Sequence, residues 1–395
     1  MNKNPLERLF EVNTDAEIWW DSSPLIYQGW AAEMVKKAPD QQKAKIWQEQ
    51  FERMYNPDHP ERGLFRGVTT NPPLSLKAIK ANEPYWENFV ENLVKENPGI
   101  DKEKLFWLTY KEIVKRGAQM YQKVFEDSGY KYGYLSGQLD PRVRNDVDTM
   151  VAQAEELHSL NPNVMIKVPG TKEGYEVIRI LTSKGIPTNN TLAFMIPQFL
   201  AAANAVKKGL EEAKANGVDL SQWRSVITAM SARYGTLGDL KKEAEERNIE
   251  LTESDIRWAE ISIFKKAYRL IKEGGYPSKM LLCSMRVSPI INGKPHCWHL
   301  EKIAGADIVY TCPPPFIEKL MFEYEDIEFK PDAIYEDPPK DVLDKLLRIP
   351  YFERGYMEDG YTPDEFNTHS ALVATAIEFS NATQGMIDFV AKHLN

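Results

Sequence analysis

A lysine stands inside an apolar segment whose pattern predicts a buried strand. The segment from Val164 to Val168 is apolar except for Lys167, and Pro169 and Gly170 close it. A short continuous apolar run of this kind predicts a strand that is buried on both faces. Burial favours the neutral amine, so we expect the pKa of Lys167 to fall below the ordinary value of about 10.4. A neutral amine attacks ketones and aldehydes to form an imine, whereas the alternative is an amine that reaches solvent from the strand end.

Composition narrows the class of protein. The 395 residues are 43% hydrophobic and 27% charged, which is typical of a soluble globular protein with a sizeable core. The formal net charge of -9 argues against nucleic acid as a partner. We expect no membrane helix, because no apolar span of about 20 residues is present, and no signal peptide. The widely spaced Cys283, Cys297 and Cys312 favour reduced thiols and a cytoplasmic location.

Strand-like and helical segments alternate along the chain. Eight such alternations in a chain of this size predict an α/β fold, the (β/α)8 barrel. The first three strands are separated by unusually long connections, so we expect extra helices there, together with a helical extension at the C-terminus. Both ends are expected to fold onto the barrel, which makes residues 1–395 one domain. The predicted strands are Glu17–Asp21, Gly67–Pro73, Tyr134–Asp140, Asn163–Gly170, Ile186–Phe194, Ser225–Ser231, Lys279–Arg286 and Ala306–Pro313.

Polar side chains collect at the C-terminal ends of these strands, where barrels of this type carry their chemistry. The set suits a carbonyl substrate with a phosphate group. The lysine would form the imine, the carboxylate would move a proton, and the arginines would bind phosphate by charge-assisted hydrogen bonds. Polar residues at strand ends are also common turn formers, and Asn71 before Pro72 has that alternative interpretation. The set is Asp21, Asn71, Gln138, Lys167, Asn189, Thr191, Thr228, Arg233, Ser284 and Arg286.

Six of the segments resemble those of transaldolases and follow one another in the same order. The similarity spans Ile18 to Ile317 and is weaker in the final helix. It implies a class I aldolase mechanism on a barrel fold, with sugar phosphates as substrates and the lysine as the only electron sink, so that neither a metal nor an organic cofactor is needed. The segments are Ile18–Ser22, Gly67–Pro72, Leu135–Arg142, Met165–Thr171, Asn189–Phe194 and Ser284–Arg286.

The resemblance also implies a role for each residue of the set. Lys167 would form the Schiff base, and Asp21 would be the general acid/base for cleavage of the carbon–carbon bond. Thr191 would position the catalytic water, in a step that Gln138 would share. The remaining assignments are Asn71, Asn189 and Thr228 for the dihydroxyacetone unit, and Arg233, Ser284 and Arg286 for phosphate.

Three positions depart from the family pattern. Transaldolases carry a glutamate where this chain has Gln138, whereas the related fructose-6-phosphate aldolases also have glutamine. Glutamine can orient a water but cannot accept its proton. Met230 stands where transaldolases have phenylalanine and the aldolases tyrosine, and Thr228 replaces a serine while keeping the hydroxyl. These changes leave imine chemistry intact and put the choice of substrate and the efficiency of transfer in question.

Three functions therefore remain open. The first is a transaldolase-type transferase that moves a dihydroxyacetone unit between sugar phosphates. The second is an aldolase-like lyase, or a specialised sugar-phosphate enzyme of secondary metabolism. The third is a catalytically silent barrel, against which the presence of both Lys167 and Asp21 argues. The segment His296–His299 contains two histidines and a thiol, but a loop is favoured over a metal site. The oligomeric state stays open, a homodimer included.

Overall fold

Eight strands form a closed parallel barrel, in the order β1-β10-β7-β6-β5-β4-β3-β2. The structure is a computed structural model that describes residues 2–324 and 327–394. Two further strands, β8 and β9, form a separate antiparallel pair. The strands are β1 (Glu17–Asp21), β2 (Phe65–Thr69), β3 (Leu135–Gln138), β4 (Val164–Pro169), β5 (Thr188–Thr191), β6 (Ser225–Met230), β7 (Lys279–Cys283), β8 (Ile290–Ile291), β9 (Lys294–Pro295) and β10 (Val309–Cys312).

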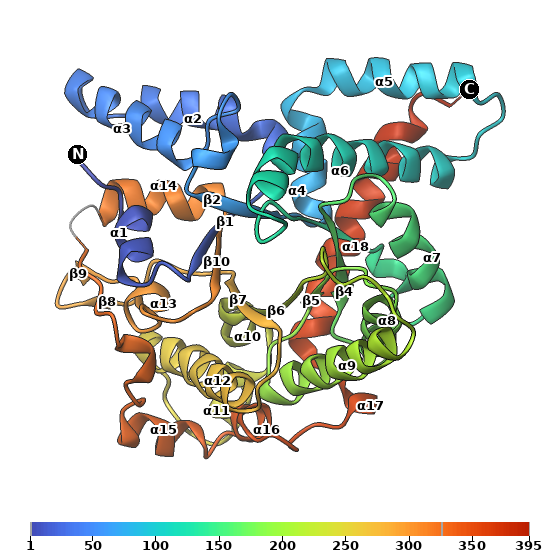
Figure 1. The fold of residues 1–395 in the computed structure, drawn as a ribbon. Coiled ribbons are helices and arrows are strands. Elements are labelled where there is room, and N and C mark those ends of the chain that lie inside the picture. The colour runs from blue at the N-terminus through green and yellow to red at the C-terminus, as the bar shows by residue number, and fades with distance from the viewer. Residues whose placement is uncertain (1, 325–326, 395) are drawn as a thin grey trace. The chain divides into compact units, whose positions relative to one another are not determined.

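Helices separate the barrel strands, so the (β/α)8 fold predicted from the sequence is confirmed (Figure 1). The extra helices after the first two strands and the helical extension at the C-terminus are confirmed as well. The α-helices are α1 (Pro5–Val12), α2 (Tyr27–Lys36), α3 (Gln41–Met54), α4 (Pro72–Ala81), α5 (Glu83–Glu96), α6 (Lys102–Asp127), α7 (Val147–His158), α8 (Lys172–Ser183), α9 (Ile196–Ala215), α10 (Ser231–Leu237), α11 (Leu240–Glu246), α12 (Glu253–Glu273), α13 (Trp298–Glu301), α14 (Pro314–Glu323), α15 (Lys340–Leu346), α16 (Pro350–Tyr356), α17 (Pro363–Phe366) and α18 (Ser370–Ala391). Short 3-10 helices are η1 (Pro24–Ile26), η2 (Pro60–Arg62), η3 (Pro141–Val143) and η4 (Ala333–Tyr335).

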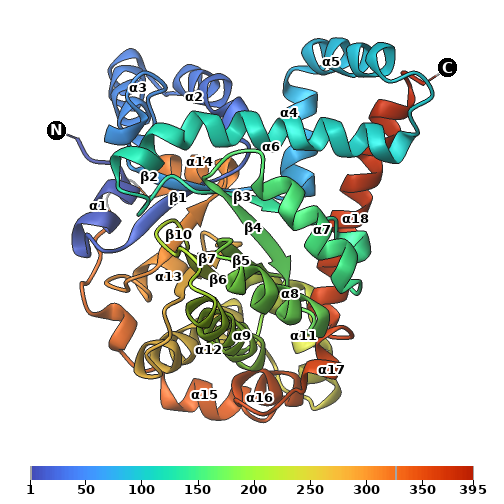
Figure 2. The ribbon, with the colours of Figure 1, turned by 45° about the vertical axis from the view of Figure 1, so that its right-hand side comes forward.

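The chain forms two compact units, and each contributes strands to the barrel. The first comprises Met1–Trp19 and Val168–Thr375, and the second comprises Trp20–Lys167 and Ala376–Asn395. Within the first unit α8 packs against α9, and within the second α5 lies beside the long helix α6 (Figures 1 and 2). A single domain stays a prediction. Among the described residues, no helix combines the length and the apolar composition that crossing a membrane requires.

The central strands are buried along their whole length. Every residue of β4, β5 and β6 is buried, which explains why β4 shows no alternation of polar and apolar residues in the sequence. The strand β5 is different in composition, because its four residues Thr188 to Thr191 are all polar and at most 1% exposed. Buried polar groups need hydrogen-bond partners, so we expect the side chains of β5 to form hydrogen bonds with one another or with a ligand.

Most predicted strands run past the observed ones at their C-terminal ends. The second was predicted to include Pro72 and Pro73, but β2 ends at Thr69 and these prolines open α4. Proline suits the first helical turn because its φ is preset and its missing N–H would have no partner there. Asn71 Oδ1 caps this helix by accepting a hydrogen bond from the Leu74 N–H at 3.0 Å. The same error lengthened the predicted strands at β3, β5, β7 and β10, which end at Gln138, Thr191, Cys283 and Cys312.

A buried ion network holds the beginnings of β1, β6 and β7 together. Glu17 is 1% exposed, and its carboxylate contacts Arg224, just before β6, and Lys279, the first residue of β7, with 2.9 Å to Lys279 Nζ. Trp19 Nε1 donates to the other carboxylate oxygen at 2.9 Å. Burial alone would raise the pKa of Glu17, but Arg224 and Lys279 overcome this and hold the pKa below its ordinary value. Glu17 therefore stabilises the fold as an anion.

We predict that Glu17→Gln lowers the free energy of unfolding by about 1–3 kcal/mol near neutral pH, because Arg224 and Lys279 lose their anion. Since the folded-state pKa of Glu17 lies below the unfolded value, this stabilisation is present above the unfolded pKa and is lost as pH falls through the folded pKa. Urea denaturation of both proteins at neutral and acidic pH measures the difference. A gap that stayed constant down to acidic pH would contradict the assignment to the Glu17 carboxylate.

Candidate active site

The amine of Lys167 is buried inside the barrel strand β4. The residue is 4% exposed, and its Nζ donates a hydrogen bond to the backbone oxygen of Thr70 at 3.0 Å. Thr70 follows directly after β2. The prediction that Lys167 lies on a buried strand is confirmed. The hydrogen bond to the backbone of Thr70 fixes the position of the amine.

The carboxylate of Asp21 is fixed by Thr69, the last residue of β2 and the neighbour of Thr70. Asp21 is the last residue of β1, and Thr69 Oγ1 donates to its Oδ1 at 2.7 Å. Two successive residues, Thr69 and Thr70, thus contact the carboxylate and the amine. Sequence reasoning missed Thr69, because the predicted strand ran on to Pro73 and placed this hydroxyl in the interior of the strand.

Gln138 lies beside the lysine on the adjacent strand. In the parallel pairing of β3 and β4, Gln138 is in register with Lys167, and residues in register point to the same face of a sheet. The hydroxyl of Tyr110 on α6 forms two hydrogen bonds with the backbone of Gln138. It donates to the backbone oxygen at 2.7 Å and accepts from the backbone N–H at 2.9 Å. The side-chain Oε1 of Gln138 is buried and accepts no hydrogen bond from the described residues. An amide oxygen in that position is available to a substrate or a water.

The polar residues of β5 and β6 form a second group, which belongs to the first unit. Thr228 Oγ1 donates to Asn189 Oδ1 at 2.6 Å, and both residues are at most 1% exposed. This bond orients the Asn189 amide. Thr191 Oγ1 lies 3.9 Å from the sulfur of Met230, which is a weak acceptor. The hydroxyl of Thr228 therefore aligns the amide of Asn189. The hydroxyl of Thr191 contacts a weak sulfur acceptor, which a ligand oxygen could readily replace.

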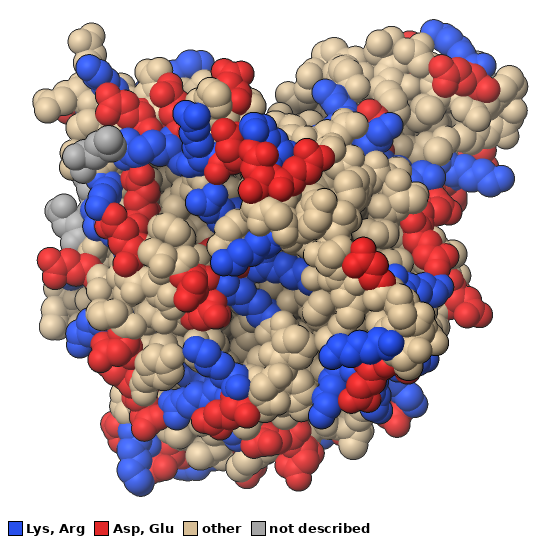
Figure 3. All heavy atoms as spheres, viewed as in Figure 1, with Lys and Arg blue, Asp and Glu red and all other residues tan. Residues whose placement is uncertain are grey.

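Arg233, Ser284 and Arg286 lie in the segments that follow β6 and β7. These strands pair in parallel with Met230 opposite Cys283, so both segments leave the sheet at the same level. Ser284 adopts a φ of 58°, in the left-handed region that non-glycine residues seldom occupy. Such backbone conformations cluster at functional sites. Figure 3 shows Lys and Arg side chains gathered in the part of the view where Figure 1 draws β6 and β7.

The residues of the segment from His296 to His299 serve separate partners. His296 Nδ1 lies 3.1 Å from Glu301, and the thiol of Cys297 donates to the backbone oxygen of Arg286 at 3.6 Å. Burial raises the pKa of Cys297 well above its ordinary range, which disfavours the thiolate form that binds metals. Within the described ranges, no three His, Cys, Asp or Glu side chains gather so that they could hold a metal ion.

Residues 51–351 match the model of the family described as Transaldolase/Fructose-6-phosphate aldolase. The chain belongs to this family. The matched segment contains nine of the ten predicted site residues and excludes Asp21, whose strand precedes it.

Curated relatives carry the name transaldolase. The chain is 33% identical to Transaldolase 2 of Streptomyces coelicolor over 45% of this chain and 48% of the relative. It is 31% identical to the transaldolase of Saccharopolyspora erythraea, over 56% and 62%. It is 29% identical to that of Renibacterium salmoninarum, over 62% and 68%. The matches thus span about half to two thirds of the length of these relatives.

We predict that Thr228→Val lowers kcat/KM with a ketose phosphate by about 5- to 30-fold, because losing the donor to Asn189 Oδ1 costs about 1–2 kcal/mol in positioning. Thr228→Ser is the matched control, since it keeps the hydroxyl, and it should retain most activity. Steady-state kinetics of the three proteins measure the effect. Equal losses in the two variants would show that the methyl group of Thr228 matters and the hydroxyl does not.

Proposed function

We propose that the protein is a transaldolase-type transferase that moves a dihydroxyacetone unit from a ketose phosphate to an aldose phosphate. The observation that carries the proposal is the buried amine of Lys167 on β4, in register with Gln138 and inside the segment that matches the family. A lysine amine in such a position suits imine formation with a carbonyl substrate. The names of the curated relatives point to the same reaction class.

The proposed reaction begins with Lys167. Its amine adds to the ketone carbon, the ketone oxygen leaves as water, and an imine forms. Asp21 then takes the proton of the hydroxyl group beside the scissile carbon–carbon bond, so that an aldehyde departs and an enamine remains on Lys167. The enamine attacks the aldehyde carbon of the acceptor, Asp21 returns the proton, and water releases the product. The contact with Thr69 Oγ1 supports this role, because it aims the carboxylate.

The other polar residues would bind the substrate. Asn71, Asn189 and Thr228 suit the hydroxyl groups of the dihydroxyacetone unit, and the Thr228–Asn189 hydrogen bond supports the pairing. Arg233, Ser284 and Arg286 suit phosphate, because the two arginines follow adjacent strands. We also propose that the enzyme acts in the cytoplasm on free sugar phosphates and needs no cofactor, since the lysine imine itself accepts the electron pair.

A second candidate is an aldolase-like lyase, or a specialised sugar-phosphate enzyme. The observation in its favour is the amide of Gln138, whose Oε1 lacks a hydrogen bond from the described residues and cannot carry a proton away. Without a carboxylate there, the water that opens the imine would depend on Asp21 or Thr191. Transfer and simple cleavage would then divide differently than in an enzyme with glutamate.

We predict that borohydride with a ketose phosphate adds mass to a peptide that contains Lys167 and to no other. Lys265 is the informative rival, because it too is buried and its pKa is lowered to about 8 by desolvation. Its Nζ, however, donates hydrogen bonds to the backbone oxygens of Ala333 and Glu336, and these two bonds hold the amine where a substrate would not reach it. Intact mass followed by peptide mapping makes the measurement.

Two results would remove the assignment. One is a label on the peptide that contains Lys265, and the other is full labelling of Lys167→Ala. A protein that binds the ketose phosphate but never labels would turn the conclusion towards the silent barrel.

We predict that Gln138→Glu increases the rate of transfer, because general acid/base assistance is typically worth about 10²–10⁴-fold. Gln138→Leu is the matched control, since it removes the polar group without adding a proton carrier, and it should slow both transfer and cleavage. Both activities are measured across pH. A severe loss of both in Gln138→Glu would instead show that the amide itself is required and that the native reaction is not ordinary transaldolase transfer.

A further inference from the structure

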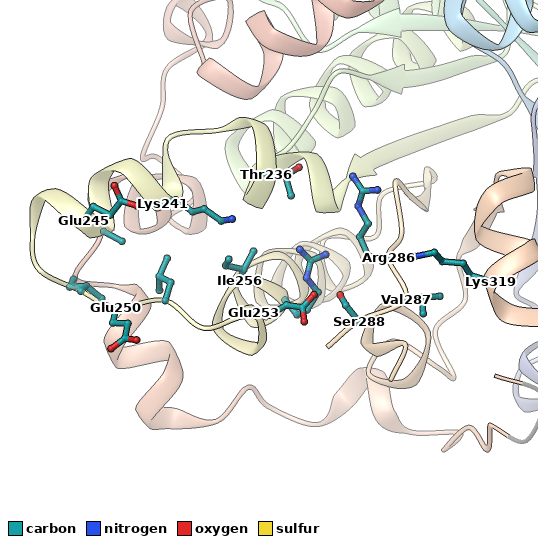
Figure 4. A pocket seen from close by; sticks show the side chains of 14 residues that line it. Thr236, Lys241, Glu245, Glu250, Glu253, Ile256, Arg286, Val287, Ser288 and Lys319 are labelled. Carbon is teal, nitrogen blue, oxygen red and sulfur yellow. The ribbon is translucent and has the colours of Figure 1, made fainter. Parts of the chain in front are cut away.

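A cavity of about 670 Å³ adjoins Arg286 in the first unit. Its walls come from α10, α11, the start of α12, the segment after β7, and α14 (Figure 4). This volume suits a small phosphorylated metabolite. The roles proposed above use only Arg286 of the residues that line it.

The charges around the cavity are unevenly placed. Figure 4 shows Arg286, Lys319 and Ser288 at one end, with Glu253 beside Ser288, and Lys241, Glu245 and Glu250 at the other. In the part of the chain that the structure describes, neither Arg286 nor Lys319 forms a side-chain ion pair. These two cations therefore have no directly paired carboxylate among the described residues, while Glu253 lines the cavity and Glu260 acts electrostatically on Arg286.

Arg257 on α12 also lines the cavity, and its guanidinium is incompletely paired. The residue is 4% exposed. Its Nη1 lies 2.7 Å from Glu260 Oε2, one helical turn away, yet neither Nε nor Nη1 donates an aligned hydrogen bond to a described residue. Burial lowers the pKa of Arg257, and Arg286 adds to this by repulsion while Glu260 opposes it. A buried guanidinium with unused donors is costly, and an anion in the cavity would offset that cost.

An ion pair and two hydrogen bonds connect Arg257 with the segment that carries Arg286. Glu260 Oε2 lies 3.0 Å from His299 Nε2, and His299 Nδ1 accepts from the backbone N–H of Arg286 at 3.0 Å. Because Nδ1 accepts, the proton of a neutral His299 is on Nε2 and is donated to Glu260. Glu260 and His299 are both fully enclosed. Glu260 and His299 thus connect the guanidinium of Arg257 with the backbone of Arg286.

A hydroxyl completes the basic end. Ser288 Oγ is buried and has no hydrogen-bond partner among the described residues, and Ser288 lines the cavity. Two different buried side chains, Arg257 and Ser288, therefore leave donors unused at the same place. Guanidinium and hydroxyl donors together are the groups that recognise phosphate oxygens.

We propose that Arg257 and Ser288, together with Arg286, form an anion-binding subsite that takes a phosphate monoester. The monoester belongs either to the sugar-phosphate substrate or to a second phosphorylated molecule. The proposal rests on the proposed function only for the choice between these two sources. In either case Arg257 contributes to phosphate affinity, although it lies outside the set of residues that the sequence suggested.

The test measures the binding of inorganic phosphate to the full chain by titration calorimetry. We expect Arg257→Gln to weaken phosphate binding by about 10- to 100-fold, because the substitution removes charge-assisted hydrogen bonds to the phosphate oxygens. Arg269→Gln is the matched control, because Arg269 lies on the same helix, is paired with Asp337 and does not line the cavity. It should bind phosphate as the wild type does. Ser288→Ala should give a smaller loss in the same direction.

A second variant covers the case in which Arg257→Gln does not fold, since it leaves Glu260 buried without its cation. Arg257→Gln combined with Glu260→Gln removes both charges, and it should show the same loss of phosphate binding. Unchanged affinity in the variants of Arg257, equal losses in Arg257→Gln and Arg269→Gln, or no phosphate binding by the wild type would each overturn the subsite.

Inhibition kinetics distinguish the two sources of phosphate, and both outcomes uphold the subsite. Phosphate that competes with the ketose phosphate, with a raised KM in Arg257→Gln, assigns the cavity to the substrate. Phosphate that lowers kcat without changing KM assigns it to a second molecule. Labelling of Lys167 by borohydride is measured on the wild type and phosphate binding on the variants of Arg257, so a failure of the proposed function is separable from a failure of the subsite.

Discussion

The hydrogen bond from Lys167 Nζ to the backbone oxygen of Thr70 depends on the register of three neighbouring strands. β2 pairs with β3, and β3 pairs with β4 so that Gln138 lies opposite Lys167. A slip of one residue in β4 would turn Lys167 to the other face of the sheet and bring an apolar side chain into its place. The buried amine would lose its carbonyl partner, Thr70, which directly follows the Thr69 that donates to Asp21.

The buried lysine strand and the barrel could be predicted from the sequence, because burial on both faces of a strand produces a continuous apolar run. A barrel strand covered on both sides must be apolar throughout, so Lys167 stands out as the exception within its strand. The alternation of strands with amphipathic helices then indicates the barrel, and the barrel places the chemistry at strand ends. The strand ends themselves were harder to predict. A capping residue such as Asn71 extends in the β region before its helix, and therefore looks like one more strand residue.

Other features depend on contacts that no local pattern records. Thr69 matters because Asp21 of another strand accepts its hydrogen bond, and Tyr110 matters because its hydroxyl reaches the backbone of Gln138. Arg257 and Glu260 are spaced as an ordinary surface pair on a helix, one turn apart. Only the packing of α12 against its neighbours shows that both are enclosed and that one of them opens on a cavity.

The ion network around Glu17 has a consequence for how such an enzyme can change over time. Glu17 begins β1 and Asp21 ends it, so one strand carries a stabilising anion at one end and the proposed acid/base residue at the other. In barrels of this kind the two ends serve separate purposes. Substitutions that trade stability for new chemistry at the reactive end can be compensated at the far end, without disturbing the residues that hold the substrate. The five residues of β1 thus include a residue whose ion pairs add stability at one end and a position where substitutions could change the chemistry at the other.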